Sequence, residues 1–528
     1  MPYKVLVSDT LAEEGIEVFR KAEGIEVDVE TNLSPEELKA VIPEYDAIAI
    51  RSATRLTADI IEAAERLKVI GRAGIGVDNV DIEAATRKGI VVMNTPEGNT
   101  ITTAEHTISL MLSMARRIPQ ATASVKAGKW EKKKFMGTEV FNKTLGIIGM
   151  GRIGRIVADR AKGLHMNVIA YDPYLSQEVI TRLGVEMVTL DELLARSDFI
   201  TIHTPKTKDT VNLINKKAFE KMKKGVYLIN CARGGIVNER DLYEAIVSGK
   251  VAGAALDVFE NEPPGDNPLL GLEQVICTPH LGASTEEAQV NVAVAVAEQI
   301  VEFLLRGTVR NAVNVPSVSA EILPHLRPYL DLAEKLGSFT AQIIQGGVRE
   351  VHLQYTGDVA QYGIEPITSA LLKGFLTPML SGNVNFVNAP VLAKARGIKV
   401  TESVTERHED YSNLITIRAI SDKEELSVSG ALLGRRNPRI LRIDNFLVEA
   451  VPEGNILFIY NEDRPGVIGN IGTTLGKNNI NIGMMQFGRD RLGGMAVSLL
   501  HLDDPVSKEV LMELQSLKHV LRVIQVEL

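Results

Sequence analysis

The feature that most constrains this chain is a glycine loop between an apolar strand and a helix. Residues 145–148 are apolar and β-prone, and they run directly into Gly149-Met150-Gly151-Arg152-Ile153-Gly154. Glycines at this spacing allow a tight turn, let the backbone approach a pyrophosphate, and let the helix pack closely on the strand. The helix N-terminus adds positive potential for the phosphates. The loop therefore predicts a nucleotide-binding unit of a doubly wound parallel sheet.

A carboxylate after the next strand indicates which nucleotide binds. Asp172 lies eighteen residues past Gly154, at the end of a predicted strand at residues 168–171. A carboxylate at this place binds the ribose 2′-hydroxyl and repels a 2′-phosphate. The pairing predicts NAD rather than NADP. The alternative is that the glycines serve only a close turn between strand and helix.

Short runs rich in Val and Ile alternate with helical patterns over the first 315 residues, which predicts two parallel α/β lobes. The predicted strands fall at residues 4–8, 47–50, 68–70, 90–93, 145–148, 168–171, 199–202, 226–229, 252–257 and 275–277. A helix at residues 101–117 carries the chain into the second lobe, and a long Ala/Val helix after Ala283 returns it to the first. Because substrates bind in clefts between lobes, we expect the active site there.

We expect four domains, since single cores rarely exceed about 300 residues and this chain has 528. They are a discontinuous substrate-binding lobe at residues 1–98 and 283–315, a nucleotide-binding domain at 99–282, an α+β domain at 316–451 and a last domain at 452–528. The last 75 or so residues show the βαββαβ order of ferredoxin-like folds. The fold class is therefore α/β, with two doubly wound lobes of Rossmann or flavodoxin type, an intervening α+β domain and a ferredoxin-like tail.

Charge and cysteine content exclude several classes of function. Lys plus Arg number 58 and Asp plus Glu number 67, so the formal net charge is −9 and the surface repels polyanions. The basic groups lack interleaved aromatic residues, which argues against nucleic-acid binding; they are Lys132, Lys133, Lys134, Arg435, Arg436, Arg439 and Arg442. The four arginines form either an anion site or a solvated basic edge. Two cysteines build neither a disulfide framework nor a zinc site, so we expect a reducing compartment and no metal.

We expect no export and no membrane contact. Asp9 comes too early for the apolar region of a signal peptide. The most apolar later stretch, residues 291–305, is interrupted by Glu298 and Glu302.

Three side chains that follow predicted strands of the second lobe have complementary chemistry: Arg233, Glu262 and His280. A guanidinium captures a carboxylate in a bidentate manner. A histidine transfers protons near neutral pH, and a neighbouring carboxylate holds its tautomer. Together they are the groups that oxidation of a 2-hydroxy acid requires, although a buried salt-bridge network is the alternative reading.

These residues bring the chain to a known family. The segments at 71–95, 149–154, 203–205, 231–237, 254–259 and 279–285 together resemble the D-isomer-specific 2-hydroxyacid dehydrogenases. Residues 455–483 look like an ACT domain, the small amino-acid-sensing module, and this is similar to the long form of the family that begins serine biosynthesis. In that form the domain at 316–451 is an intervening domain of the allosteric substrate-binding type.

The resemblance implies NAD-dependent oxidation of D-3-phosphoglycerate to 3-phosphohydroxypyruvate in the cytoplasm. His280 becomes the acid/base catalyst, Glu262 its partner, and Arg233 the anchor for the substrate carboxylate and carbonyl. Arg51, Gly74, Ile75 and Gly76 cover the bound acid, although Arg51 alternatively reads as a surface arginine at a strand end. The implied cofactor contacts are Ile75, Gly149, Gly151, Arg152, Ile153, Gly154, Asp172, Thr204, Cys231, Ala232, Arg233, Asp257, His280, Gly282 and Ala283.

The resemblance also implies assembly and regulation. Two ACT domains pair side by side and bind L-serine at their junction, with ligands expected at Asn461, Asp463 and Asn481. The alternative is an ACT fold that serves oligomerisation alone. A homotetramer is expected, with dimerisation through the nucleotide lobe. The basic run at residues 132–134 then either reaches the phosphate site of a neighbouring subunit or forms a solvated loop. His106 and His203 are interpreted as structural residues.

Two other functions stay open. One is a sibling dehydrogenase that acts on hydroxypyruvate, glyoxylate, D-lactate or 2-oxoglutarate, and substrate phosphate dependence separates it. The other is an NAD-sensing scaffold that binds partner proteins and turns over little, like the family's transcriptional corepressors. Fold likeness alone cannot separate these.

Overall fold

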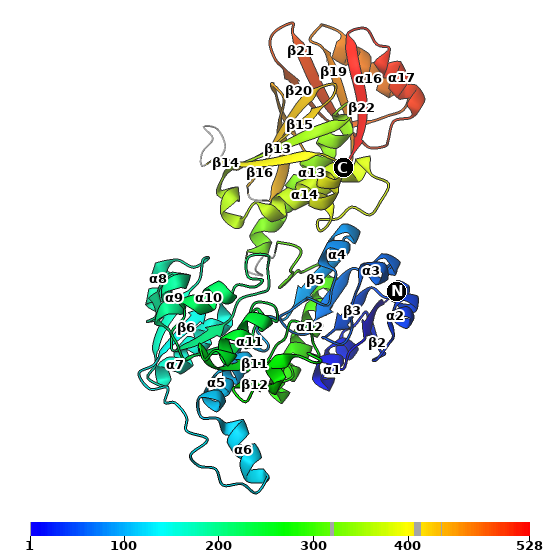
Figure 1. Cartoon of the computed structure of the whole chain (residues 1–528). Helices are drawn as coiled ribbons and strands as arrows, with labels where there is room; N and C mark the ends of the chain where they lie inside the picture. Colours follow the sequence, from blue (N-terminus) through cyan, green and yellow to red (C-terminus); the bar gives the residue numbers. More distant parts are fainter. Residues whose placement is uncertain (1, 317–321, 406–412, 435) are drawn as a thin grey trace.

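The computed structural model of this chain describes residues 2–316, 322–405, 413–434 and 436–528. Two α/β lobes make the lower half of Figure 1, and a third and a fourth unit stand above them.

The first lobe is built on five parallel strands in the order β2-β1-β3-β4-β5, the flavodoxin-like order. The strands are β1 Tyr3–Val7, β2 Ile25–Val29, β3 Ala47–Ile50, β4 Val69–Arg72 and β5 Val91–Asn94. The helices are α1 Glu13–Lys21, α2 Pro35–Val41, α3 Ala58–Ala63, α4 Ile82–Lys88 and, from later in the chain, α12 Glu286–Arg306, with a 3-10 turn η1 Ile42–Glu44. All of β3 is buried, as expected for a central parallel strand with both faces covered.

The second lobe has seven parallel strands in the order β12-β11-β10-β9-β6-β7-β8, which is the Rossmann order with one added edge strand. The strands are β6 Thr144–Ile148, β7 Asn167–Tyr171, β8 Glu186–Met187, β9 Phe199–Ile202, β10 Val226–Asn230, β11 Val251–Leu256 and β12 Val275–Cys277. The helices are α5 Thr100–Ala115, α6 Ile118–Lys126, α7 Arg152–Gly163, α8 Gln177–Arg182, α9 Leu190–Arg196, α10 Lys216–Lys221 and α11 Glu239–Val247, with a 3-10 turn η2 Pro268–Gly271. Helix α6 stands apart from the lobe at the foot of Figure 1.

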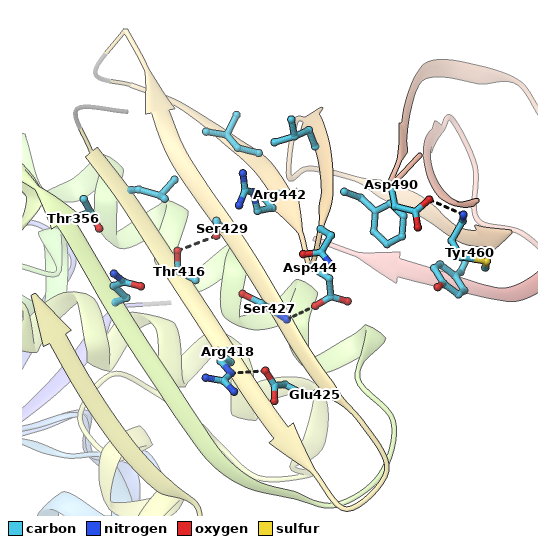
Figure 2. A pocket seen from close by; sticks show the side chains of 17 residues that line it. Thr356, Thr416, Arg418, Glu425, Ser427, Ser429, Arg442, Asp444, Tyr460 and Asp490 are labelled. Atoms are coloured by element: carbon cyan, nitrogen blue, oxygen red, sulfur yellow. Dashed lines mark hydrogen bonds and ion pairs between the residues drawn. The ribbon is translucent and has the colours of Figure 1, made fainter. Parts of the chain in front are cut away.

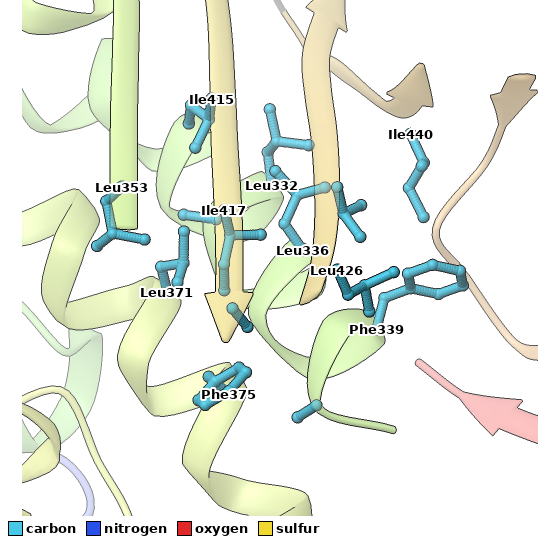
Figure 3. Close-up of a cluster of buried hydrophobic side chains, with 14 of the residues drawn as sticks. Leu332, Leu336, Phe339, Leu353, Leu371, Phe375, Ile415, Ile417, Leu426 and Ile440 are labelled. Atoms are coloured by element: carbon cyan, nitrogen blue, oxygen red, sulfur yellow. The ribbon is translucent and has the colours of Figure 1, made fainter. Parts of the chain in front are cut away.

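The third unit has a six-stranded mixed sheet in the order β14-β13-β15-β16-β17-β18. Its strands are β13 Val348–Gly357, β14 Lys399–Thr405, β15 Asn413–Ser421, β16 Glu425–Leu433, β17 Asn437–Ile443 and β18 Phe446–Ala450. Its helices are α13 Leu323–Ile343, α14 Glu365–Leu376 and α15 Ala389–Ala395, with 3-10 turns η3 Asp358–Tyr362 and η4 Thr377–Met379. Figure 3 shows side chains of α13 and α14 packed on one face of this sheet.

The fourth unit is the ferredoxin-like tail, with four antiparallel strands in the order β20-β21-β19-β22. Its elements are β19 Asn455–Glu462, α16 Val467–Lys477, β20 Ile482–Arg489, β21 Met495–Leu502, α17 Lys508–Gln515 and β22 Val520–Glu527. The predicted fold class is confirmed in all four parts.

The third and fourth units share one hydrophobic core. Helix α13 lies between the two sheets, and Phe339 on α13 makes a T-shaped contact with Phe458 on β19, with ring centroids 6.3 Å apart. Arg522 on β22 pairs with Glu424 of the third unit at 3.1 Å. Because the core is continuous, these two units are packed together rather than joined by a linker alone.

This body also rests on the first lobe. Val387, just before α15, is buried in the core cluster of the first lobe. The side-chain amide of Asn385 donates to the carbonyl of Gly89 at 2.8 Å. Gly89 ends α4 with φ +79°, a conformation that favours glycine, and the missing side chain leaves room for the Asn385 amide.

Helix α12 returns the chain to the first lobe and packs on α1 and β4. Among the described residues it is the helix whose length and apolar composition would suffice to cross a membrane, and 44% of its most apolar window is buried within the protein. Its buried face, which includes Val292, Val296 and Ile300, belongs to the core of the first lobe.

Several elements were not anticipated from the sequence. Strand β2 at the edge of the first sheet is mostly exposed, and its alternation of apolar and acidic residues extends over only five positions. Helix α4 has seven residues, and its N-cap Asp81 accepts from Ala84. Short elements of this kind carry too few periods to be recognised.

Candidate active site

The glycine loop after β6 has the shape that a dinucleotide needs. Gly149 has φ +96°, and a Cβ there would lie 2.7 Å from the carbonyl oxygen of His203. A Cβ at Gly154 would lie 2.1 Å from the carbonyl oxygen of Gly149, so both glycines are required by packing alone. At Gly151, by contrast, a Cβ would meet no atom of the described residues within 4 Å. The N-terminus of α7 therefore opens onto free space, where a phosphate group can approach the backbone.

Asp172 follows β7, where the sequence places it. Its carboxylate is buried and accepts from the backbone N–H groups of Met150 and Tyr174, both at 2.9 Å. The Asp172 carboxylate thus holds the glycine loop in place, and its oxygens keep lone pairs that can accept from a further donor. Arg152, on the same loop, pairs with Glu97 of the interlobe crossing at 3.3 Å, and Ile153 is half-buried against the lobe core.

The next strands add two walls of the same crevice. The hydroxyl oxygen of Thr204, after β9, is buried and has no hydrogen-bond partner among the described residues. Cys231, after β10, is buried, and burial raises the pKa of its thiol to about 12, so it is no nucleophile. The N–H of Ala232 is held by Asn230 at 3.0 Å. An unpartnered hydroxyl, an open helix N-terminus and a braced carboxylate around one crevice fit a dinucleotide.

His280 and Glu262 form a hydrogen-bonded pair in the loops that follow two strands of the second lobe, β12 and β11. The Nδ1 atom of His280 lies 2.7 Å from Oε2 of Glu262, and both side chains are partly exposed. Burial opposes ionisation of Glu262, but the hydrogen bonds from His280 and Phe259 hold the pKa of its carboxyl below its usual value. The ionised carboxylate fixes Nδ1 as the protonated nitrogen of the imidazole and leaves Nε2 as the proton acceptor.

Asp257, after β11, holds the loop that carries His280. Its buried carboxylate accepts from the backbone N–H groups of Leu281 and Gly282, at 2.7 and 2.8 Å, and also from the Thr278 hydroxyl. His106 on α5 lies 3.2 Å from the same carboxylate. Burial works against the charge, yet these hydrogen bonds keep the pKa of Asp257 below its usual value. Asp257 therefore acts on the loop backbone, and Ala283 follows as the loop enters α12.

His106 and His203 each contact neighbouring side chains of the second lobe, and Nδ1 of His203 is buried without a partner among the described residues. His106 bridges Asp257 and Thr278. Burial lowers the pKa of His203 to about 3, so its ring stays neutral, and its Nε2 lies 3.0 Å from the Thr201 hydroxyl.

Arg233 leaves the end of β10 and points across the cleft to the first lobe. Its Nε donates to Asp78 of the first lobe at 3.0 Å, and its Nη1 donates to the carbonyl of Ala232 at 2.7 Å. A Cβ at Gly76 would lie 1.8 Å from Nη2 of Arg233, so the glycine leaves room for the guanidinium. The two lobes therefore meet at the predicted substrate anchor.

The first lobe supplies the opposite wall. Arg51 follows β3, and its Nη1 donates to the carbonyl of Thr10 at 3.1 Å. The loop with Gly74, Ile75 and Gly76 follows β4; the Asn94 amide donates to the carbonyl of Ile75 at 2.6 Å. These residues lie at the carboxyl ends of parallel strands, which meet at one edge of a sheet.

Sequence reasoning missed Arg72, the last residue of β4. Burial and the nearby charges of Arg233 and Arg51 lower the pKa of its guanidinium to about 10. The three guanidinium groups are therefore close enough to repel one another electrostatically. Its Nε is buried without a partner among the described residues. A Cβ at Gly74 would lie 1.8 Å from Nη1 of Arg72, which explains the glycine. The sequence did contain a signal for Arg72. Arg72 ends β4, Arg51 follows β3, and these two strands are neighbours in the sheet.

Asn230 was also missed. Its amide donates to the carbonyl of Arg233 at 3.0 Å while its oxygen accepts from Ala232. It shapes the turn that presents Arg233, and a lone buried asparagine at a strand end gives no such signal in sequence.

The expected effector ligands do not meet within one chain. Asn461 lies opposite Ala496 in the sheet, whereas Ile482, next to Asn481, lies opposite Leu502 at the other end. Residues at opposite ends of the sheet can share a ligand only if two copies of the domain meet.

Each of the three has its own setting. Asn461 is buried, and its Oδ1 has no partner among the described residues. Asp463 accepts from the N–H of Gly493 at 3.0 Å and pairs with Arg489 at 3.1 Å, which lowers the pKa of its carboxyl. Asn481 donates to Asp503 at 2.8 Å.

A separate cavity of about 770 Å³ lies between the open face of the third sheet and the fourth unit (Figure 2). The hydroxyl groups of Thr416 and Ser429, on the sheet, are hydrogen-bonded to each other at 2.9 Å. Tyr460 and Asp490 line the cavity from the fourth unit. Of the arginines singled out in the sequence, Arg442 lines the cavity; Arg436 and Arg439 do not, and Arg435 lies outside the described residues. Within the described parts of the chain, no group of three or more His, Cys, Asp and Glu side chains could hold a metal ion.

Three family models match successive parts of the chain. The NAD-binding domain of D-isomer-specific 2-hydroxyacid dehydrogenases matches residues 108–282. The intervening domain of D-3-phosphoglycerate dehydrogenase matches residues 325–444, and the ACT domain matches residues 455–519.

Similar proteins extend over nearly the whole chain. A D-3-phosphoglycerate dehydrogenase of Archaeoglobus fulgidus is 51% identical, over 99% of this chain and 100% of its own length. A protein of the same name from Methanocaldococcus jannaschii is 49% identical, over 98% of each chain. Among solved structures, an NAD-dependent formate dehydrogenase of Staphylococcus aureus in complex with NAD is 31% identical with a TM-score of 0.54, over 60% of this chain and 99% of its own.

Proposed function

Because the chain belongs to the D-3-phosphoglycerate dehydrogenase family of D-isomer-specific 2-hydroxyacid dehydrogenases, we propose that it oxidises D-3-phosphoglycerate to 3-phosphohydroxypyruvate. It is an NAD-dependent oxidoreductase. The observation that carries the substrate proposal is the proximity of Arg51, Arg72 and Arg233 where the lobes meet, with the turn after Arg233 packed against Phe259, which donates to the Glu262 partner of His280. This step would begin L-serine biosynthesis in the cytoplasm.

His280 serves as the general base in the oxidative direction. The Glu262 carboxylate holds Nδ1–H, so Nε2 takes the proton of the substrate C2 hydroxyl. The imidazolium that forms lies beside the ionised carboxylate, which stabilises it. Bound NAD would supply, at its nicotinamide ring, the acceptor for the hydride that leaves C2. In the reverse direction His280 returns the proton to the C2 oxygen.

Arg233 holds the carboxylate and the developing carbonyl of the substrate. Nη1 and Nη2 keep free N–H donors, because Asp78 uses Nε and Ala232 uses one N–H of Nη1. A charge-assisted fork of this kind fixes the acid in one orientation and favours negative charge on its oxygens.

The other two arginines account for a phosphorylated substrate. The substrate carries a carboxylate and a phosphate, and Arg233 is engaged with the carboxylate. Of the acidic groups nearby, Asp9 is taken up by the backbone N–H groups of Arg51 and Thr54. Asp9 also interacts electrostatically with Arg51 and Arg72, but among the described residues it forms no ion pair with either guanidinium, so both groups stay available for the phosphate. An unphosphorylated acid would leave two partly buried cations unpaired, which is unfavourable.

The dinucleotide would lie along the loop from Gly149 to Gly154. Asp172 would hold the ribose hydroxyls, while Arg152 and Ile153 would contact the pyrophosphate. The remaining contacts would come from the strand-end residues Ile75, Thr204, Cys231, Ala232, Asp257, Gly282 and Ala283. The open space at Gly151 and the unpartnered hydroxyl of Thr204 support this placement.

Gly151→Ala tests the cofactor site without disturbing the fold. A methyl group there meets no atom of the described residues and φ is −67°, so the melting temperature should stay near that of the wild type. It would occupy the space for the pyrophosphate, so we expect NADH affinity to fall about tenfold or more by fluorescence titration. Gly163→Ala at the other end of α7 is the control, since its methyl group also meets nothing there. Equal NADH affinity in both variants would contradict the placement.

Arg51→Gln tests the phosphate site. We expect the Michaelis constant for 3-phosphohydroxypyruvate to rise about 10- to 100-fold, the worth of one charge-assisted hydrogen bond. The Michaelis constant for NADH should stay within about twofold, since Arg51 lies in the other lobe. Arg87→Gln removes an exposed charge of α4, paired with Glu83, and should change neither constant. A similar rise in both constants would remove Arg51 from the phosphate site.

Self-assembly and effector binding complete the proposal. Helix α6 stands apart from the nucleotide lobe in Figure 1. The helix and the segment after it carry exposed apolar side chains, which suits a dimer contact there; they are Ile118, Val125, Trp130, Met136 and Phe141. Pairing of ACT domains would extend the dimer to a homotetramer and bring Asn461 and Asp463 of one copy to Asn481 of another. Light scattering of the purified protein tests the tetramer.

L-Serine would be the effector at this junction. We expect millimolar L-serine to lower turnover of the wild type, and Asp463→Ala to weaken this inhibition at least tenfold, because the carboxylate can pair with the amino group. Glu513→Ala on α17 is a charge-matched control and should leave inhibition unchanged. Inhibition of equal strength in Asp463→Ala would place the effector elsewhere.

An NADH oxidation assay with 3-phosphohydroxypyruvate tests the function as a whole. Turnover supports the proposal. NADH binding without turnover on any 2-oxo acid would instead support an NAD-sensing scaffold.

A further inference from the structure

Asp78 is an acidic residue in a cleft built for anions. It lies on the loop between β4 and α4, and its carboxylate is largely exposed, with 68% of the side chain accessible. An acidic group beside Arg51, Arg72 and Arg233 weakens the attraction for a phosphorylated acid, because the Coulomb energies oppose each other. Anion binding alone therefore gives no reason for a carboxylate at this position.

The contact between Asp78 and Arg233 crosses from one lobe to the other. Oδ2 of Asp78 accepts from Nε of Arg233 at 3.0 Å, while Nη1 of Arg233 donates to the carbonyl of Ala232 at 2.7 Å. Nη2 lies where a Cβ of Gly76 would be, so the guanidinium lies directly against the backbone of the first lobe. Three groups from two lobes thus determine one side-chain orientation.

The loop that carries Asp78 is itself fixed. The side-chain amide of Asn79 donates to the carbonyls of Arg51 and Thr54, both at 2.6 Å. At the other end of the loop, the N–H of Gly74 donates to the Thr95 hydroxyl at 2.6 Å. The Asp78 carboxylate therefore has a defined place relative to the substrate lobe.

Counting donors shows what this arrangement does. A guanidinium has five N–H groups; Asp78 takes the one on Nε, and Ala232 takes one of the two on Nη1. The N–H groups that stay available are on Nη1 and Nη2, which together make one end-on fork for a carboxylate. Without Asp78, Nε and Nη2 would offer a second, side-on fork that holds the acid in a different orientation.

We propose that Asp78 is a positioning residue that restricts Arg233 to a single substrate-binding orientation and does so only when the two lobes are together. The inference rests on the proposed function, in which Arg233 binds the substrate carboxylate. It predicts that Asp78 promotes turnover while it weakens anion binding.

The Asp78→Asn variant separates these two effects. We expect kcat to fall about 10- to 100-fold, since a misplaced anchor moves the reacting carbon away from His280. Inorganic phosphate, used as an inhibitor competitive with the oxo acid, should bind as tightly as in the wild type or up to about fivefold more tightly, since one negative charge is gone. A residue with a merely structural role would lose turnover and anion affinity together.

Two further variants complete the design. Asp78→Glu keeps the charge but moves the carboxylate by one methylene, so kcat should fall while phosphate affinity stays at the wild-type value. Glu83→Gln removes an exposed carboxylate of α4 that pairs with Arg87, and it should change neither quantity. Thermal unfolding and NADH titration verify that every variant is folded.

A double-mutant cycle shows whether Asp78 acts through Arg233. In an Arg233→Lys background there is no Nε–H in the guanidinium position, so Asp78→Asn should lower kcat by less than about threefold further. Full additivity of the two losses would overturn the inference, as would an Asp78→Asn variant with wild-type kcat. A wild type that is inactive on the phosphorylated acid would instead overturn the proposed function, and with it the role of Asp78.

Discussion

The His280→Ala variant should turn over about 10² to 10⁴ times more slowly than the wild type, the usual contribution of a positioned general acid or base. The structure gives the reason: Glu262 holds Nδ1 of His280 at 2.7 Å, which leaves Nε2 to exchange the proton with the substrate oxygen. The nearest carboxyl groups, Asp257 and Glu262, do not replace this group at neutral pH, because their pKa values are lowered.

The same variant should bind NADH almost normally. The His280 side chain is half exposed and takes no part in the glycine loop after β6. Steady-state turnover and NADH fluorescence titration of one preparation measure both quantities. A variant with near-normal turnover would remove His280 from the proton transfer, and a variant that has lost NADH binding would show a structural role instead.

The Asp257→Asn variant should lose both stability and turnover. The buried Asp257 carboxylate accepts hydrogen bonds from Leu281, Gly282 and Thr278. In the variant, the NH₂ group of the asparagine side chain would face some of these donors and could not accept from them. Leaving buried donors unpaired costs about 3 kcal/mol of the free energy of unfolding. Because this loop carries His280, kcat should also fall about 10²-fold.

Denaturant unfolding and turnover measure the two effects, and Asp159→Asn serves as the control because Asp159 is an exposed carboxylate of α7. A stability equal to that of the wild type would show that the hydrogen bonds of Asp257 contribute little.

The pH dependence of stability follows from the same carboxylates. Asp257 and Glu262 have folded-state pKa values below their usual values. A lowered folded-state pKa contributes stability that is present above the unfolded value, near 4, and is lost as the pH falls through the folded value. The free energy of unfolding that these two groups contribute should therefore be constant between about pH 6 and 8 and decline below about pH 4. The Asp257→Asn variant should show a smaller decline over that acid range.

The sequence was sufficient for the parts of the site that have a fixed spacing. The glycine loop and Asp172 lie on consecutive elements, and Arg233, Glu262 and His280 follow strands whose carboxyl ends must converge in a doubly wound sheet. The strand order therefore places these side chains at one edge of the sheet, whereas the pairing of His280 with Glu262 is seen only in the structure.

Contacts between the lobes could not be derived in this way. The role of Asp78 depends on Arg233, which comes from the other lobe, and the sequence contains no spacing that relates residues 78 and 233. The shared core of the third and fourth units was missed for the same reason, since Phe339 and Phe458 are brought together by packing and not by a local pattern.

The most direct test of the central claim is the ratio of kcat/KM for 3-phosphohydroxypyruvate to that for unphosphorylated hydroxypyruvate, measured as NADH oxidation by absorbance. With Arg51 and Arg72 reserved for the phosphate, the ratio should exceed about 10², because an unphosphorylated acid leaves charged groups unpaired. Turnover of both acids with similar kcat/KM would contradict the account and identify a dehydrogenase of broader 2-oxo acid specificity.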